Sequence, residues 1–89
     1  MAYTIHEGSE AMLDARLIGA VIQEYRERKR ISQEVISGLA GIGRTHLSAI
    51  ERGQRKPTLE TFFKLSDALN VKPSELMKLI EERIENQND

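Results

Sequence analysis

Apolar residues recur along this chain at spacings of three and four residues, which is the period of a helix with one buried face. The first such stretch covers residues 12–29, and its apolar stripe consists of Leu17, Ile18, Val21, Ile22 and Tyr25. Four shorter stretches of the same kind follow it. No stretch has the alternation of apolar and polar residues that marks a half-buried strand. The pattern predicts an all-α fold, a bundle of five helices joined by short loops.

Capping and turn residues set the predicted boundaries between these helices. Ser32 and Thr58 are good N-caps for the second and fourth helices. Gly41 and Gly53 are suited to end the second and third helices, because glycine readily adopts the left-handed conformation at a helix C-terminus. The fifth helix follows Pro73.

The apolar positions of the later helices indicate the core and the extent of the domain. The residues that we expect to pack the second helix against the third are Ile36, Leu39, Ile42, Leu47 and Ile50, with Val35 on the same face of the second helix. The fourth and fifth helices carry Leu59, Phe62, Phe63, Leu65, Leu69, Leu76, Met77, Leu79, Ile80 and Ile84. We expect one domain over residues 12–85, an N-terminal tail or helix extension over 1–11, and a frayed tail over 86–89.

The composition narrows the class of protein. A domain of 89 residues buries only about 60 % of its unfolded surface, so a partner subunit would help to stabilise it. There is no cysteine, and the two histidines, His6 and His46, lie too far apart for a metal site. His6 belongs to the tail, where we expect no role for it. The sequence has no secretory signal and no run near the ~18 apolar residues of a membrane span. We therefore expect a cytoplasmic protein that needs no cofactor.

The net charge of −1 conceals an uneven distribution along the chain. Residues 26–57 carry eight Lys and Arg against three Glu, which makes this segment +5, while residues 1–25 and 58–89 are each −3. A basic centre between acidic ends is typical of a surface that binds a polyanion. The alternative is a solvated surface on which the charges cluster by accident.

The spacing of the second and third helices is that of a helix-turn-helix. Two short helices are separated by the tight turn Gly41-Ile42-Gly43. In that arrangement the first helix crosses the phosphate backbone of DNA and the second meets base edges in the major groove. The polar residues that project from the third helix are Arg44, Thr45, Ser48 and Arg52. Their side chains suit base recognition, although an ordinary solvated helix face would have the same spacing.

A resemblance to a known family extends over most of the chain, from Arg16 to Ile80. The run SQEVISGLAGIGRTHLSAIERGQRKPTLETFFKLSDALNVKPSEL closely resembles the Cro/repressor-type (Xre-family) DNA-binding domain. The matching positions include Ser32, Gln33, Gly41, Ile42, Leu47, Ser48, Ile50, Glu51, Gly53, Pro57, Thr58, Leu59, Ala68, Leu69 and Val71. The small size is similar to that of restriction–modification controller proteins and small phage-type repressors. The resemblance implies a lambda-repressor-like bundle.

The chain departs from the family pattern at four positions in the helix-turn-helix. Ser37 replaces a small alanine and must bond its hydroxyl to a carbonyl one turn back. Gly38 costs about 1 kcal/mol in a helix interior. Gly43 is a weaker N-cap than the usual Ser, and Val35 stands where an acidic capping residue often lies.

The resemblance implies three sets of DNA contacts. Gln33 would hydrogen-bond a phosphate at the N-terminus of the second helix. The base-facing surface would consist of Arg44, Thr45, His46, Ser48 and Arg52. The loop and the start of the fourth helix would hold the backbone through Arg55, Lys56 and Thr58. His46 has an alternative role as a solvent-exposed residue at the edge of the interface.

Two further expectations concern assembly. The family positions of Arg26 and Glu51 imply a buried ion pair, and an inward Glu51 would avoid repelling phosphates. The fifth helix carries more apolar residues than one narrow stripe, which favours a twofold contact between two copies. The expected interface residues are Phe63, Leu76, Met77, Ile80 and Ile84. The alternative is that the fifth helix only completes the core of the monomer.

These observations favour a transcriptional regulator that binds double-stranded DNA as a homodimer on an inverted-repeat operator. An antitoxin-like protein whose main partner is another protein is the alternative, and the short unassigned N-terminus disfavours it. An enzyme is set aside because no nucleophile–base pair, metal cluster or phosphate loop is evident. No small-molecule effector and no membrane association are expected.

Overall fold

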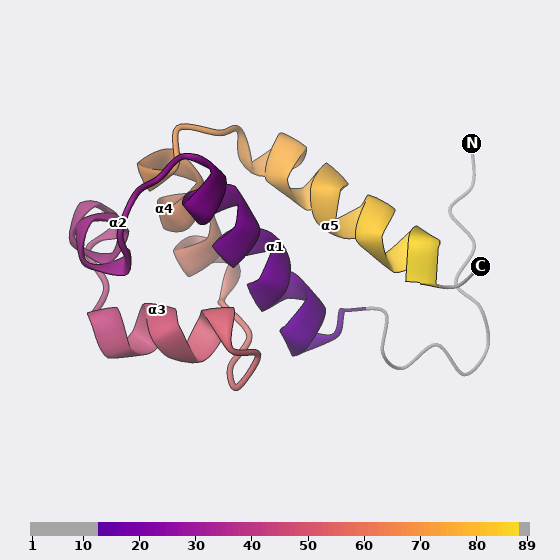
Figure 1. The fold of residues 1–89 in the computed structure, drawn as a ribbon, viewed down its shortest axis with the longest axis horizontal. Coiled ribbons are helices and arrows are strands. Elements are labelled where there is room, and N and C mark those ends of the chain that lie inside the picture. The colour runs from indigo at the N-terminus through magenta and orange to yellow at the C-terminus, as the bar shows by residue number, and fades with distance from the viewer. Residues whose placement is uncertain (1–12, 88–89) are drawn as a thin grey trace.

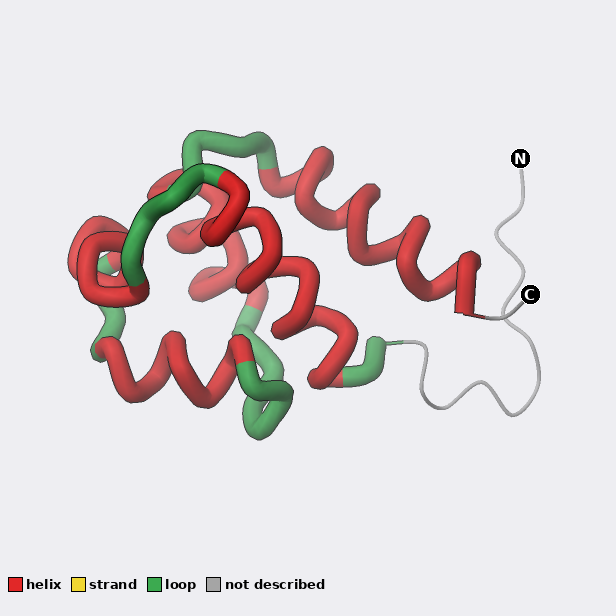
Figure 2. Tube along the Cα trace, viewed as in Figure 1, coloured by secondary structure: helices red, strands yellow, loops and turns green. Residues whose placement is uncertain are grey.

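The computed structural model describes residues 13–87, which form five α-helices and no strand. The helices are α1 (Ala15–Arg28), α2 (Gln33–Ala40), α3 (Arg44–Glu51), α4 (Leu59–Ala68) and α5 (Pro73–Gln87). In Figure 1, α2 and α3 lie at one end of the molecule, and α5 runs beside α1 toward the other end. Figure 2 shows that short loops join all five helices. The predicted all-α fold class is confirmed.

The first four helices end in the same way. At each of these ends, the residue where the chain leaves the helix has a positive φ. These residues are Arg30, Gly41, Gly53 and Asn70. In each case the next amide donates to the carbonyl five residues back, with N···O distances from 2.9 to 3.3 Å. This is the Schellman motif, which satisfies carbonyls that a helix end leaves free. Glycine adopts a positive φ without strain at the two positions where the sequence predicts a helix end.

Side chains cap the N-termini of three helices. The backbone amides of Arg16, Val35 and Thr61 donate to Asp14, Ser32 and Thr58. Ser32 and Thr58 are thus the N-caps that the sequence predicts, whereas α3 begins after Gly43 with no side-chain cap.

The bounds of the first and last helices differ from the predicted ones. Because Asp14 caps α1, this helix begins at Ala15 rather than at residue 12. At the other end, α5 continues through Gln87, so the prediction of a frayed tail from residue 86 is wrong for Asn86 and Gln87. No glycine or proline follows Pro73 in α5 to stop the helix, and each added residue gains a hydrogen bond. The predicted tail over residues 1–11 lies outside the described residues.

One apolar core joins all five helices. Its fully buried side chains are Ile22, Ile36, Leu47, Ile50, Leu65, Leu69, Leu76 and Ile80. α1 packs against α3 and α5, while α2 packs against α3 and α4. Leu76 and Ile80 were expected at a dimer interface, and this prediction is wrong. They are 0 % and 1 % exposed within a single chain because α5 turns this face onto α1 and α4.

The second helix buries a different face from the expected one. Its buried residues are Ile36, Ser37 and Ala40, whereas Val35 is 50 % and Leu39 is 67 % exposed. The small side chains of Ser37 and Ala40 let α2 approach its neighbours on their side. With Ser37 and Ala40 facing the core, Val35 and Leu39 face away from it. The Ser37 hydroxyl donates to the Glu34 carbonyl at 3.2 Å, as its burial requires.

A glycine in the middle of α1 sets the closest contact between α1 and α3. A Cβ atom on Gly19 would overlap the carbonyl oxygen of Ile50 and lie 2.7 Å from that of Glu51. The backbone of α1 therefore rests directly on the C-terminal turn of α3. This contact fixes the position of α3 against the rest of the bundle.

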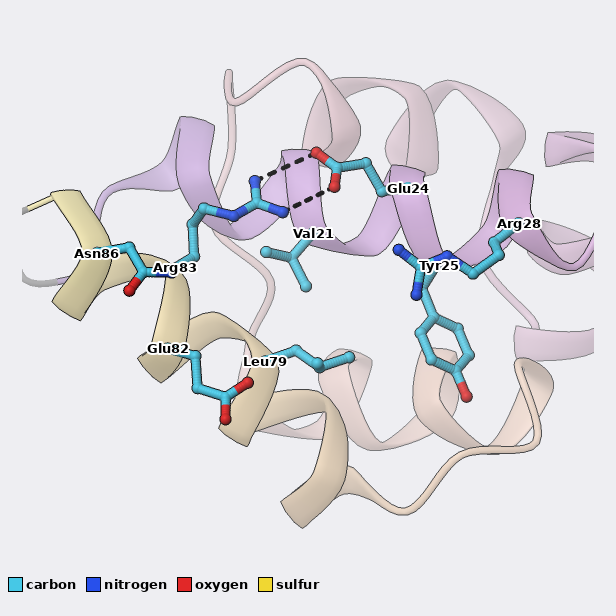
Figure 3. A pocket seen from close by; sticks show the side chains of 8 residues that line it. All are labelled: Val21, Glu24, Tyr25, Arg28, Leu79, Glu82, Arg83 and Asn86. Carbon is cyan, nitrogen blue, oxygen red and sulfur yellow. Dashed lines mark hydrogen bonds and ion pairs between the residues drawn. The ribbon is translucent and has the colours of Figure 1, made fainter.

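An ion pair ties the far end of α5 to α1. Arg83 donates to both carboxylate oxygens of Glu24, at 2.7 and 3.2 Å, above the apolar side chains of Val21 and Leu79 (Figure 3). The residues around it line a hollow of about 160 Å³. The hydrogen bond from Arg83 lowers the pKa of the Glu24 carboxyl. The pair thus stabilises the fold above the ordinary carboxylate pKa, and this contribution is lost as the pH falls through the lowered value.

The described glycines differ in the space around them, and this gives a first prediction. A Cβ atom on Gly38 would meet nothing within 4 Å. Gly38→Ala should therefore raise the free energy of unfolding by about 0.5–1 kcal/mol, because alanine loses less backbone entropy in a helix. Urea unfolding followed by circular dichroism measures this difference.

Gly19→Ala is the matched control, because the same added methyl group overlaps backbone atoms there. It should lower the free energy of unfolding by about 1–3 kcal/mol, the usual cost of overpacking. Equal effects of the two substitutions would contradict the close contact between α1 and α3.

Candidate nucleic-acid interface

The third helix is held by one face and leaves the other free. Leu47 and Ile50 are fully buried, and Glu51 is 4 % exposed. At about 100° per residue, the opposite face is centred on Thr45, Ala49 and Arg52. This outward face carries small and hydrogen-bonding side chains.

The remaining residues predicted to face bases lie around that centre. Ser48 is half-buried beside it, while Arg44 and His46 lie on opposite edges of the face. Arg44, Thr45 and Arg52 are exposed, and the Arg52 guanidinium donates to Gln54 Oε1 at 3.2 Å. Ala49 was missed by the sequence argument, although the helical period alone places it on the outward face.

A buried hydrogen-bonded cluster holds the two helices of the motif against α1. Arg26 donates from Nε to one carboxylate oxygen of Glu51 at 2.7 Å and from Nη2 to the other at 3.0 Å. Its third nitrogen donates to the Ile31 carbonyl at 2.7 Å. The two side chains are 10 % and 1 % exposed, and the Glu51 carboxylate raises the pKa of Arg26. The ion pair expected from the resemblance is therefore present, with all nitrogens of the guanidinium bonded.

Gln33 also belongs to this cluster. Its amide nitrogen donates to Glu51 Oε1 at 2.8 Å, so one carboxylate binds side chains from both α1 and α2. Gln33 is the first residue of α2 and remains half-buried. One N–H of the amide group is engaged within the protein, and the other is available to a ligand. A phosphate contact through Gln33 stays a prediction.

The turn between α3 and α4 carries the other predicted phosphate contacts. Arg55 and Lys56 are exposed there. The Thr58 hydroxyl is engaged at the start of α4, where it accepts from the Thr61 amide and donates to the Thr61 hydroxyl. A phosphate contact at Thr58 would therefore use its backbone amide more readily than its hydroxyl.

Exposed apolar residues line a groove of about 110 Å³, which Lys56 and Pro57 of the α3–α4 turn border as well. Leu13, Leu59 and Met77 line it and are 49 %, 74 % and 38 % exposed. Phe63, one turn after Leu59, is 59 % exposed. Ile84 is half-buried against the core. We call the surface formed by Leu13, Leu59, Phe63 and Met77 the apolar face.

The described part of the chain has neither a metal site nor a membrane span. Within residues 13–87, no group of three His, Asp or Glu side chains is placed to hold a metal ion. None of the helices in this range is both long and apolar enough to cross a membrane.

The sequence of residues 22–76 matches the family described as helix-turn-helix. The chain belongs to this family. An uncharacterized HTH-type transcriptional regulator from Sinorhizobium fredii is 36 % identical over 62 residues, which cover 70 % of this chain and 80 % of the relative.

Solved helix-turn-helix structures have the same fold. The restriction–modification controller protein C.AhdI from Aeromonas hydrophila is 38 % identical with a TM-score of 0.68, over 71 % of this chain and 96 % of that one. The controller protein C.Esp1396I, solved as a tetramer with its natural 35 base-pair operator, has a TM-score of 0.75. It covers 81 % of this chain and 95 % of its own at 24 % identity, so it shows the fold alone.

The buried cluster of the helix-turn-helix gives a second prediction. Glu51→Gln removes the charge that balances Arg26, and the guanidinium remains buried. The free energy of unfolding should fall by about 3–5 kcal/mol, the usual cost of leaving a buried charge unpaired. Chemical denaturation measures the loss.

The exposed pair between Glu24 and Arg83 provides the control, because it has the same paired geometry in contact with water. Glu24→Gln should cost about 0–1 kcal/mol. A loss from Glu51→Gln no larger than this would mean that the buried pair does not hold the motif together.

Proposed function

We propose that this protein is a transcriptional regulator that binds DNA sequence-specifically as a homodimer. The observation that carries the proposal is the outward face of α3. It stands free of the core and consists of hydrogen-bonding and small side chains, and the N-terminus of α2 and the basic turn before α4 both adjoin the end of α3 at Glu51. A helix presented in this way fits the major groove of B-DNA.

In this arrangement α3 reads the bases. Arg44 can bond two acceptors of guanine at once, and Thr45 and Ser48 can bond base edges through their hydroxyls. The methyl group of Ala49 suits contact with the methyl group of thymine. His46, at the edge of the face, would contact either a base or the adjacent backbone.

The surrounding residues would hold the phosphate backbone. Gln33 would use its second amide N–H, supported by the N-terminus of α2. Arg55 and Lys56 in the turn would neutralise phosphates and make the affinity depend on salt. The inward position of Glu51 supports this assignment, since its charge is balanced by Arg26 and does not face the DNA.

The apolar face would form the twofold contact. Leu59, Phe63 and Met77 present a continuous apolar surface that a single chain leaves in water. Ile84 would add the end of α5, whereas Leu76 and Ile80 support the contact from within the core. A symmetric dimer covers the same patch on both subunits.

The relatives favour this function over its alternatives. They are transcriptional regulators and control proteins, which gives no support to an antitoxin. We assign the protein no catalytic step. A regulator of this kind would act in the cytoplasm, where its DNA is accessible.

Selecting bound sequences from a random DNA pool tests the function directly. The dimer presents two recognition helices, so the recovered site should be an inverted repeat with half-sites about 10 base pairs, or ~34 Å, apart. Recovery of no common sequence, or of one without twofold symmetry, would contradict the proposal.

Base recognition by Arg44 gives a third prediction. Arg44→Ala should weaken binding to the selected site by about 1–3 kcal/mol and relax the preference at one position per half-site. Binding to random DNA should change much less. Titrations with both kinds of DNA measure the two losses.

Arg55→Ala is the matched comparison, because Arg55 is assigned to the backbone. It should weaken binding to selected and random DNA alike. If Arg44→Ala behaves in the same way as Arg55→Ala, then Arg44 does not recognise a base.

Dimerisation through the apolar face gives a fourth prediction. Met77→Glu places a charge on this face in both subunits, so the protein should sediment as a monomer that keeps its helical content. Because the second half-site is then no longer tethered, the variant should bind the inverted repeat only as weakly as a single half-site.

Leu39→Glu is the control for sedimentation, since Leu39 is also apolar and even more exposed than Met77 but lies on α2. It should remain dimeric. A dimer that survives Met77→Glu unchanged would place the twofold contact elsewhere.

A further inference from the structure

Arg16 lies beside the turn that follows α3, although it is distant from that turn in the sequence. It is the second residue of α1, and a Cβ atom on Gly53 would lie 2.5 Å from its Cα and Cγ atoms. The chain of Arg16 therefore rests on the turn at Gly53. In the sequence, Arg16 belongs to residues 1–25, which have a net charge of −3. The sequence alone therefore does not show that Arg16 lies near this basic turn.

Two contacts keep Arg16 in this position. Gly53, whose φ is +75°, brings the turn against the first residues of α1. One turn further along α1, Gly19 rests on the carbonyl groups of Ile50 and Glu51. The N-terminal end of α1 is thus fixed to the end of α3 at two points. The backbone that carries Arg16 therefore needs no further ordering when the side chain binds a ligand.

The side chain itself is available to a ligand. It is 83 % exposed, and its only ion pair in the described structure is a contact of 3.6 Å with Asp14. Asp14 is engaged mainly as the cap of α1, where the Arg16 amide lowers the pKa of its carboxyl. A weak exposed pair of this kind contributes little to stability and yields readily to a phosphate.

The neighbouring turn is positively charged, as Arg16 is. Arg52 adjoins Gly53, and Arg55 and Lys56 follow in the same turn. Arg16 adds a positive charge from a second segment to this set, on the side where α1 begins. A phosphate backbone that follows the turn would continue past the N-terminus of α1.

We propose that Arg16 contacts a phosphate of the bound DNA beyond the α3–α4 turn. This inference rests on the proposed function and extends the backbone contacts to α1. Arg16 supplies affinity and register but no base recognition, as phosphate contacts do. Its partner Asp14 weakens the contact, because its carboxylate lies next to the guanidinium and repels the same phosphate.

The test compares the salt dependence of DNA binding in three variants of the whole protein. Arg16→Gln should weaken binding to selected and random DNA alike, and should reduce the slope of log affinity against log salt by about two units per dimer, one for each phosphate whose counterion is no longer released. Arg16→Lys keeps the charge and should keep the slope. Asp14→Asn should bind more tightly, because asparagine caps a helix as well as aspartate does and carries no charge.

Lys78→Gln is the control, since Lys78 is an exposed cation on α5 and should leave the slope unchanged. If Arg16→Gln binds with the slope of the wild type, or Asp14→Asn binds no more tightly than the wild type, the inference is overturned and the proposed function stands. Absence of DNA binding by the wild type would instead overturn the proposed function. Because Arg16 is exposed, urea unfolding of Arg16→Gln should match that of the wild type.

Discussion

The carboxylate of Glu51 is the group on which the arrangement of the motif depends. It lies at the end of α3 and accepts hydrogen bonds from Arg26 on α1 and Gln33 on α2, so that three helices meet at one buried charge. Such a pair contributes little net energy compared with apolar packing, because both ions lose their hydration. The pair instead fixes the relative positions of the three helices, because any other arrangement of them would leave a buried charge unpaired. The recognition helix is thus fixed against α1 and α2 at the point where its own last turn ends.

The surface assigned to DNA follows from this fixed position. Because Glu51 is turned inward, no acidic side chain lies on the outward face of α3, which consists of small, polar and basic residues. The contacts at Gly19 and Gly53 then bring the N-terminus of α1 to the turn after α3. Arg16 thereby joins the basic residues of this turn, in a chain whose net charge is −1. Most acidic residues belong to the terminal segments of the sequence and not to the +5 segment over residues 26–57, which holds the end of α1, α2, α3 and the turn.

The sequence predicted the parts of this structure that local chemistry determines. Ser32, Thr58, Gly41 and Gly53 act at helix ends through their own side chains or φ angles, so single residues indicated the boundaries. Burial was predicted less well, because it depends on how closely neighbouring helices approach. Because Ser37 and Ala40 face the core, α2 is rotated so that Leu39 is exposed to water. Ile80 is buried by α5 within the monomer, although the apolar period of α5 would equally have allowed it to contact a partner subunit. The roles of Gly19 and Arg16 arise from contacts between distant segments, for which the sequence has no local signal.

The most direct test of the DNA-binding surface is an NMR titration of the nitrogen-15-labelled protein with a duplex recovered by selection. The largest amide shift changes should fall on the outward face of α3, on the N-terminus of α2 and on the turn between α3 and α4, with a further set at the N-terminus of α1. The amides around the α1–α5 hollow should change little. Changes concentrated on that hollow or on the outer face of α2, with α3 unaffected, would contradict the assignment of α3 as the recognition helix.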